Sequence, residues 1–326
     1  MSPNSKPVSK PDPPVQFEPS AEPKLPLSDE LDELRSTISI EALETAALSA
    51  STLIEGAVAG AEANRESGNL LPVPQPFISF NNVSIAFGER KVLDNVSFHV
   101  GRGQTLCILG RSGVGKSVSL RILLGFLKAD SGSIVVDGIE ISKLSEGGLR
   151  EIRKEVSMVF QNGALFDSLT VGENIAFPLR EKGGLAEDQI QQLVARLLQL
   201  VGASDTIDHL PSSLSTGQKR CISIARALAA QPKAILYDEP TTMVDPIMGR
   251  RIGDLIQRLK HQLGLTSIVV THDMRFAIRL ADLVLFLDSG EAAFFGTIHE
   301  FHKCTDPRVQ QFLTLDTYEL PATSVR

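Results

Sequence analysis

The sequence predicts an α/β protein with a parallel β-sheet, an antiparallel β region and a helical insert. Short apolar segments recur after residue 100, and helical patterns separate them, which is typical of buried parallel strands. Residues 77–100 instead alternate between apolar and polar side chains around a Gly88-Glu89-Arg90 turn, which favours antiparallel strands. Residues 165–214 carry apolar side chains at helical spacing, so they are expected to form the insert.

Composition places the chain among soluble globular proteins. It has 326 residues, of which 42% are apolar, and this length allows about two domains. The net charge is −7 and no patch combines aromatic with basic residues, so no nucleic-acid partner is expected. The cysteines lack metal or redox spacing and are expected to act as small hydrophobes in a reducing compartment. They are Cys107, Cys221 and Cys304.

The first 76 residues are expected to be a largely disordered, partly helical extension. Residues 1–27 are rich in Pro, Ser and Lys and cannot bury enough apolar surface to fold, and they do not resemble a secretory signal. Residues 38–63 are alanine-rich, but three acids argue against a membrane span. This stretch is either a docking helix or a helix lying on the surface of a tail. A proline linker closes the extension with Pro72, Pro74 and Pro76.

The folded part is expected from residue 77 to about residue 300, followed by a tail at 301–326. Its first strands are expected at 77–83, 84–88 and 91–100, and later ones at 105–109, 134–136, 139–141, 156–160, 233–237, 267–270, 283–287 and 292–295. Helices at 174–180 and 187–201 are divided by Gly183-Gly184. They belong to a helical subdomain of about residues 165–230.

The segment Gly110–Ser117 reads G-x-x-x-x-G-K-S and lies between the strand at 105–109 and a helix from Val118. This strand–turn–helix context predicts a phosphate-binding loop rather than a chance glycine-rich turn. Glycines let successive N–H groups face an anion, and the helix N-terminus adds positive charge. Lys116 is expected to reach the phosphates, and the Ser117 hydroxyl to bind Mg²⁺. The expected phosphate-binding residues are Gly110, Arg111, Ser112, Gly113, Val114, Gly115, Lys116, Ser117 and Val118.

Several motifs besides this loop occur in the order found in one family. They are Gln161 in Val-Phe-Gln, Leu-Ser-Thr-Gly-Gln at 214–218, Ile-Leu-Tyr-Asp-Glu at 235–239, Asp245 and His272. On these motifs, residues 77–298 resemble the nucleotide-binding domain of ABC transporters. The resemblance implies a P-loop NTPase fold with an antiparallel β subdomain and a helical signature subdomain, and an ATPase that binds ATP and Mg²⁺.

Polar residues at strand ends are expected to carry the chemistry, because ligands bind at the carboxyl ends of parallel strands. Asp238 is expected to hold Mg²⁺, with a turn-capping acid as the alternative. Glu239 is expected to be the general base, with a solvated surface acid as the alternative. Gln161 can touch Mg²⁺ or the attacking water, or it is a polar cap. His272 is expected to bond the γ-phosphate and align Glu239, or it is structural.

The resemblance adds roles for the remaining site residues. Phe87 is implied to stack on adenine, with a core phenylalanine as the alternative. Residues 214–218 resemble the family's signature motif, in which Ser215, Gly217 and Gln218 would face the nucleotide of a second subunit. Thr216 replaces the usual glycine and puts turnover and dimer tightness in question. Asp245 resembles the acid of the loop between subunits, or it is a turn acid before a proline.

A narrower resemblance concerns the transported substrate. Residues 159–181 and 306–313 are similar to the ATPases of Mla/Mce-type lipid transporters. This similarity implies a homodimer with ATP at its interface, on the cytoplasmic face of the inner membrane. It also implies a separate permease contacting residues 165–180, and allows a lipid-binding Mce-type substrate protein. The tail is implied to reach the partner ATPase, so deletion from Asp306 is expected to weaken dimerisation and leave the monomer folded. Another solute, or a soluble ABC ATPase, remains an alternative.

Overall fold

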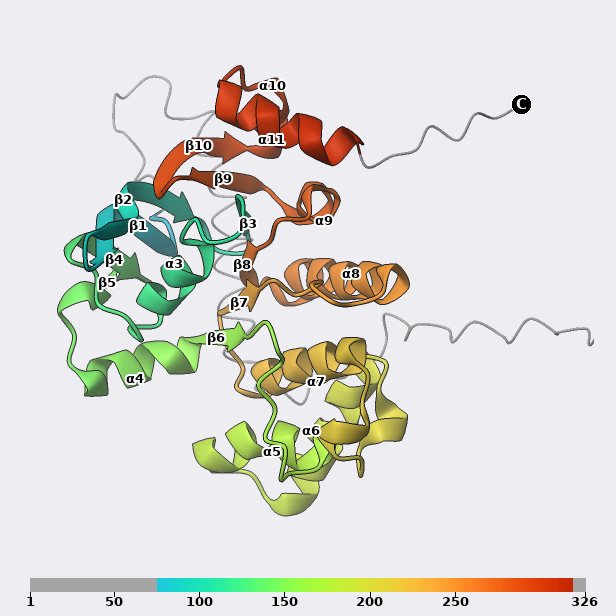
Figure 1. Ribbon diagram of the computed structural model, residues 1–326. Helices are drawn as coiled ribbons and strands as arrows, with labels where there is room; N and C mark the ends of the chain where they lie inside the picture. The colour runs from blue at the N-terminus through green and yellow to red at the C-terminus, as the bar shows by residue number, and fades with distance from the viewer. Residues whose placement is uncertain (1–74, 319–326) are drawn as a thin grey trace, which may run out of the picture.

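The computed structural model describes the backbone of residues 75–318 and the side chains of residues 75–314. Expectations for residues 1–74 and 319–326 lie outside this range. The described residues form two β-sheets with helices around them (Figure 1). No helix in this range is long and apolar enough to span a bilayer.

The first sheet is antiparallel and contains four strands in the order β2-β1-β4-β5. They are β1 (Ile78–Phe87), β2 (Arg90–Val100), β4 (Ser131–Val136) and β5 (Ile139–Glu140). The two strands expected within 77–88 are one strand, because register shifts between Phe80 and Ala86 absorb the break in alternation. Phe80 and Phe98 stack across β1 and β2, with ring centroids 4.3 Å apart.

The second sheet has six strands in the order β10-β9-β3-β8-β7-β6, all parallel except β10. They are β3 (Thr105–Leu109), β6 (Val156–Val159), β7 (Ala234–Asp238), β8 (Thr266–Val270), β9 (Leu283–Asp288) and β10 (Glu291–Thr297). The sheet separates two hydrophobic cores. Leu106 and Ile108 face one core, and Cys107 and Leu109 face the other, because successive side chains of a strand point to opposite faces.

Each face of this sheet carries its own helices. Helices α3 (Lys116–Leu123) and α4 (Glu146–Glu155) contribute to the core shared with the antiparallel sheet. The other core contains α5 (Val171–Lys182), α6 (Glu187–Leu200), α7 (Thr216–Ala229), α8 (Pro246–Leu263) and α9 (Met274–Leu280). The insert between β6 and β7 is therefore helical as predicted, with its break at Gly183. Helix α4 was not predicted.

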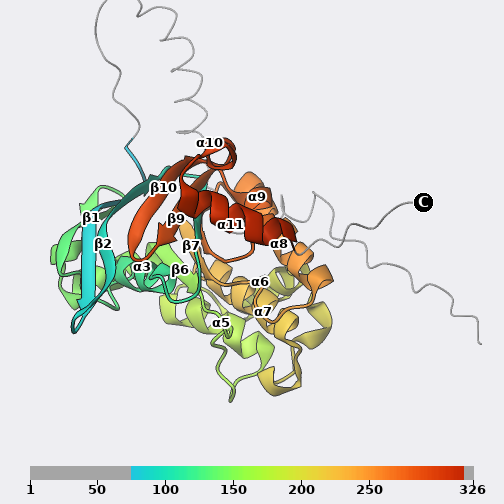
Figure 2. The same ribbon diagram turned by 45° about the horizontal axis from the view of Figure 1, so that its top comes forward.

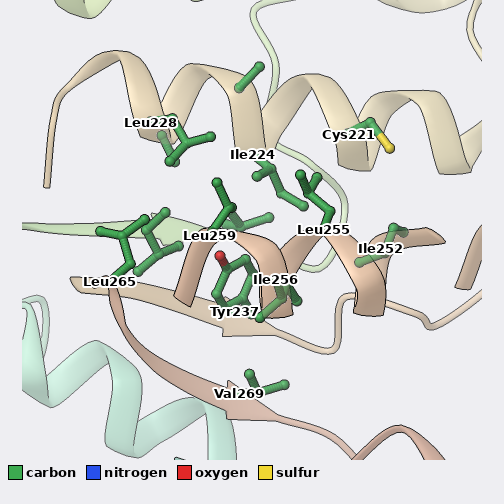
Figure 3. Close-up of a cluster of buried hydrophobic side chains, with 14 of the residues drawn as sticks. Cys221, Ile224, Leu228, Tyr237, Ile252, Leu255, Ile256, Leu259, Leu265 and Val269 are labelled. Carbon is green, nitrogen blue, oxygen red and sulfur yellow. The ribbon is translucent and has the colours of Figure 1, made fainter. Parts of the chain in front are cut away.

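Helices α7 and α8 pack on β7 and β8 through the second core. Figure 3 shows Ile224 and Leu228 of α7 above Leu255 and Leu259 of α8, with Tyr237 of β7 below them. Cys221 joins this cluster, and burial raises the pKa of its thiol to about 11. A protonated, buried thiol acts as a small hydrophobe, which confirms the prediction for this cysteine.

The C-terminal helices α10 (Ile298–Lys303) and α11 (Pro307–Tyr318) lie against the β9–β10 edge of the sheet (Figure 2). Val309 is fully buried, and the Phe312 ring lies 4.9 Å from that of Phe286. The start of the tail is therefore part of the protein's own core. Deletion from Asp306 would remove these core contacts, and the expectation that the monomer stays folded without them remains a prediction.

Deletion of residues 306–326 is expected to lower the melting temperature clearly relative to a control lacking only residues 319–326. Losing the fully buried Val309 side chain removes about 1.5–3 kcal/mol of stability, and losing the half-buried Phe312 ring adds to this. Thermal unfolding followed by circular dichroism tests this, and equal midpoints for both truncations would contradict it.

Candidate active site

Strand pairing brings the ends of four parallel strands to one edge of the second sheet. The paired residues are Val159 with Tyr237, Asp238 with Val270, and Ile108 with Val270. The chain that follows each strand contains Gln161, Glu239, His272 and the loop from Gly110. Residues far apart in the sequence thus gather at the carboxyl edge, where open α/β sheets bind ligands.

The glycine-rich loop between β3 and α3 has a backbone that only glycine tolerates at two positions. Gly110 has a φ of 148°, and a side chain there would collide with the Leu287 carbonyl oxygen. Gly115 has a φ of 106°, and a Cβ would lie 2.6 Å from the Val92 carbonyl oxygen. Residues 111–113 between them are exposed. The loop backbone is therefore closely packed at Gly110 and Gly115, and the residues between them are accessible from outside the protein.

Lys116 is buried, and its side chain folds back onto this loop. Its Nζ donates to the carbonyl oxygens of Gly110, at 2.9 Å, and Arg111, at 3.1 Å. It also lies 3.5 Å from Oε1 of Glu239. The ammonium group thus bridges the loop and the acid after β7, at the position where phosphates would need a cation.

Ser117 and Asp238 form a pair of oxygen donors beside this lysine. The Ser117 hydroxyl donates to Oδ1 of Asp238 at 2.7 Å. Burial is the largest influence on Asp238 and raises the pKa of its carboxyl, and nearby Glu239 adds to this. A hydroxyl and a carboxylate are ligand types that Mg²⁺ accepts. No group of three His, Cys, Asp or Glu side chains that could hold a metal occurs among the described residues.

The Glu239 side chain is buried and hydrogen-bonded, so the alternative that it is a solvated surface acid is wrong. It is 9% exposed and adopts a φ of 48°. Its Oε2 lies 2.9 Å from Nδ1 of His272 and accepts a hydrogen bond from the Thr242 hydroxyl at 3.1 Å. Thr242 was missed in the sequence, since only the turn after β7 brings it back to the acid.

Two expected site residues are exposed at the margin of the site. Phe87 ends β1 and is 51% exposed, so the alternative of a core phenylalanine is wrong. Gln161 follows β6 with an exposed side chain, which suits a ligand as well as a polar cap. The hairpin that carries Phe87 also supplies Arg90, whose Nη2 donates to the Gly113 carbonyl oxygen at 3.3 Å. No motif in the sequence singles out this arginine.

The motif at 214–218 is not brought to the loop of its own chain. It begins α7, which packs on the opposite face of the sheet from α3. Ser215 and Gln218 form a capping box, in which each side chain accepts from the other's backbone N–H. Thr216 is exposed in the first turn of α7. Gly217 is buried where a Cβ would collide with Met248, so the start of α7 packs closely on α8.

Asp245 is the N-cap of α8. Its Oδ1 accepts a hydrogen bond from the Met248 N–H at 2.9 Å. The residue is exposed, so its helix-capping role leaves one carboxylate oxygen available to solvent or to another chain.

Comparison with known proteins identifies the family. A family model of ABC transporters matches residues 93–242. The methionine import ATP-binding protein MetN of Brucella abortus is 42% identical over 248 residues, which cover 76% of this chain and 67% of that protein. The intermembrane phospholipid transport system ATP-binding protein MlaF of Haemophilus influenzae is 39% identical over 239 residues, covering 73% of this chain and 90% of the relative.

Solved structures agree with this assignment. A dimeric post-hydrolysis state of the ATP-binding cassette MJ0796, bound to ADP and Pi, superimposes with a TM-score of 0.64 at 31% identity. The match covers 68% of this chain and 98% of that structure. The chain therefore belongs to the ATP-binding subunits of ABC transporters, and it is an ATPase that binds ATP.

Proposed function

We propose that this chain powers the movement of phospholipid, or another hydrophobic lipid, through a separate membrane permease. The observation that carries the ATPase part is the cluster of Lys116, Ser117, Asp238, Glu239 and His272 at one sheet edge. In this proposal residues 77–300 are the ATP-binding domain, residues 165–230 its helical subdomain and residues 301–326 a tail.

The residues present fit a magnesium nucleotide. Gly110 and Gly115 let the loop backbone pack against the carbonyl oxygens of Leu287 and Val92, and the proposed phosphate-binding set remains residues 110–118. Ser117, Asp238 and Gln161 supply the hydroxyl, carboxylate and amide oxygens that would hold Mg²⁺. A bound Mg²⁺ would neutralise charge on the phosphates.

The protein's own groups divide the remaining work at the proposed site. Lys116 draws the phosphates to the loop, because its ammonium is the nearest buried cation. Glu239 takes the proton of the attacking water. His272 holds Glu239 through their side-chain contact and would bond the γ-phosphate, and Phe87 would support the adenine ring.

A second copy would complete the site. The start of α7, with exposed Ser215, buried Gly217 and half-buried Gln218, lies on the opposite face of the sheet from the loop, so it would meet the nucleotide of a partner. Asp245 lies between two exposed apolar residues, Met243 at 90% and Ile247 at 70%. A homodimer would cover these side chains. The related cassette MJ0796 is dimeric in its solved structures.

The permease would contact the segment after Gln161. Phe166 and Phe177 are 44% and 45% exposed, and their rings lie 5.1 Å apart. The Arg226 guanidinium lies over the Phe166 ring. This aromatic pair with an adjacent cation suits a short amphipathic helix of a membrane protein, which would place the complex on the cytoplasmic face of the inner membrane.

The lipid substrate rests on the similarity of residues 159–181 and 306–313 to Mla/Mce-type ATPases, and one relative is named as a phospholipid transport ATPase. Other relatives are named as methionine importers. The test is to purify the full chain with its copurifying permease and measure ATP turnover with phosphatidylglycerol vesicles or with L-methionine. Stimulation by vesicles alone supports the proposal, with a lipid-binding Mce-type protein as a further partner. Stimulation by methionine alone, or no copurifying permease, would refute it.

Phe177→Ser is expected to reduce copurification of the permease strongly, because the exposed half of this ring would lose its contact. ATP turnover of the isolated chain should change less than about twofold, since surface substitutions alter stability by only about 0.5 kcal/mol. The matched control is Phe126→Ser, at a phenylalanine that is 51% exposed in the loop after α3. Equal loss of permease with both variants would contradict the proposed contact surface.

A further inference from the structure

The chain turns sharply after β7, and this turn carries a hydroxyl back to the catalytic edge. Glu239 and Met243 both have positive φ, at 48° and 61°. The backbone N–H of Thr242 donates to the Glu239 carbonyl oxygen at 3.3 Å. Positive φ is costly for residues other than glycine. The closed turn holds Thr242 directly beside the Glu239 side chain.

The two oxygens of the Glu239 carboxylate have different surroundings. Oε2 accepts from the Thr242 hydroxyl at 3.1 Å and lies 2.9 Å from Nδ1 of His272. Oε1 lies 3.5 Å from Nζ of Lys116, beyond an ordinary hydrogen bond. One oxygen is therefore anchored, and the other faces the phosphate-binding loop.

Of the two groups on Oε2, Thr242 is tied more closely to the backbone of the acid. The His272 side chain is largely exposed, and its ring is carried by the segment after β8. Thr242 belongs to the same closed turn as Glu239, and its β-branched side chain has few rotamers. The terminal torsion of a glutamate is soft, so a fixed donor is needed to keep one oxygen in place.

We propose that Thr242 is a positioning residue that holds Oε2 of Glu239, so that Oε1 faces the attacking water. This inference rests on the proposed role of Glu239 as the general base. Thr242 acts only through that carboxylate. Moving the oxygen of a general base by a fraction of an ångström is enough to slow proton transfer, because the base and the reacting atoms must be aligned.

The test compares Thr242→Val with Thr242→Ser in the full chain. Valine keeps the size and β-branching of threonine but has no hydroxyl, whereas serine keeps the hydroxyl. Thr242→Val is expected to lower kcat about 10- to 100-fold, with the Kd for Mg-ATP and the melting temperature nearly unchanged. Thr242→Ser is expected to keep kcat within about threefold of the original protein. Mg-ATP binding, steady-state turnover and thermal unfolding are measured for both.

Other results would overturn the inference in distinguishable ways. If Thr242→Val kept the kcat of the original protein while Glu239→Gln was inactive, Thr242 would not position the base, and Glu239 would still be the general base. Equal losses in the valine and serine variants show that the hydroxyl is not responsible. A loss of ATP binding or of stability in Thr242→Val shows a structural role instead. Full activity in Glu239→Gln would show that Glu239 is not the general base and that Thr242 therefore does not position one.

Discussion

Lys116→Ala is expected to weaken Mg-ATP binding by about 100-fold or more, since hydrogen bonds from a charged donor each contribute about 1.5–3 kcal/mol. The substitution removes the buried ammonium that joins the Gly110 and Arg111 carbonyl oxygens. It also leaves Glu239 without its nearby cation, so negative charge at the site would repel the phosphates. Equilibrium titration with Mg-ATP measures the change in Kd.

The matched control for this experiment is Lys143→Ala. Lys143 is exposed shortly after β5 and pairs with Glu140 at the end of that strand, so its loss should leave the Kd unchanged. Circular dichroism of both variants shows whether the fold is retained. A folded Lys116→Ala protein with the original affinity would mean that phosphates do not bind at this loop.

The phosphate-binding loop was predictable because its requirements are local. Gly110 and Gly115 are glycines since the chain turns with positive φ against neighbouring carbonyl groups. The strands were predictable for a similar reason, because burial on both faces demands an unbroken apolar run such as residues 106–109. Because the strands pair in parallel, the polar residues that follow them lie together at one edge of the sheet.

The details that the sequence did not reveal depend on contacts between distant segments. Helix α4 has only Ile152 fully buried, so its apolar pattern was too weak to predict a helix. The tail is expected from the resemblance to reach a partner subunit, yet Phe312 packs on Phe286 of β9 in its own chain. Whether a side chain is buried depends on which segment of the folded chain packs against it, and the neighbouring residues in the sequence do not indicate that segment.

Glu239→Gln is expected to lower ATP hydrolysis by about 10²–10⁴-fold, the usual range for losing a positioned base. Glutamine keeps the shape and can still accept the Thr242 hydrogen bond, but it cannot take a proton from water. Binding of Mg-ATP should survive, because Lys116 keeps its contacts with the loop. Single-turnover hydrolysis and equilibrium binding measure the two effects separately.

Asp238→Asn separates the two adjacent acids. Asp238 is bonded to Ser117, and burial raises the pKa of its carboxyl, so it lies where a divalent cation would compensate a buried charge. Its amide variant should need more Mg²⁺ to reach half-maximal binding, whereas Glu239→Gln should keep the original Mg²⁺ requirement. Equal Mg²⁺ titrations for both variants would refute this division of roles.

The Glu239→Gln protein also tests the proposed second copy, because ATP that is bound but not hydrolysed should hold two chains together. Sedimentation with Mg-ATP is expected to show a stable dimer for this variant and a transient one for the original protein. Ser215→Arg, at the exposed start of α7, should prevent that dimer when combined with Glu239→Gln, since its bulk would block the approach of the second nucleotide. If Glu239→Gln bound ATP and remained monomeric, the motif at 214–218 would not serve a partner's site. If it hydrolysed ATP at the original rate, proton transfer would have to be assigned to a group other than Glu239.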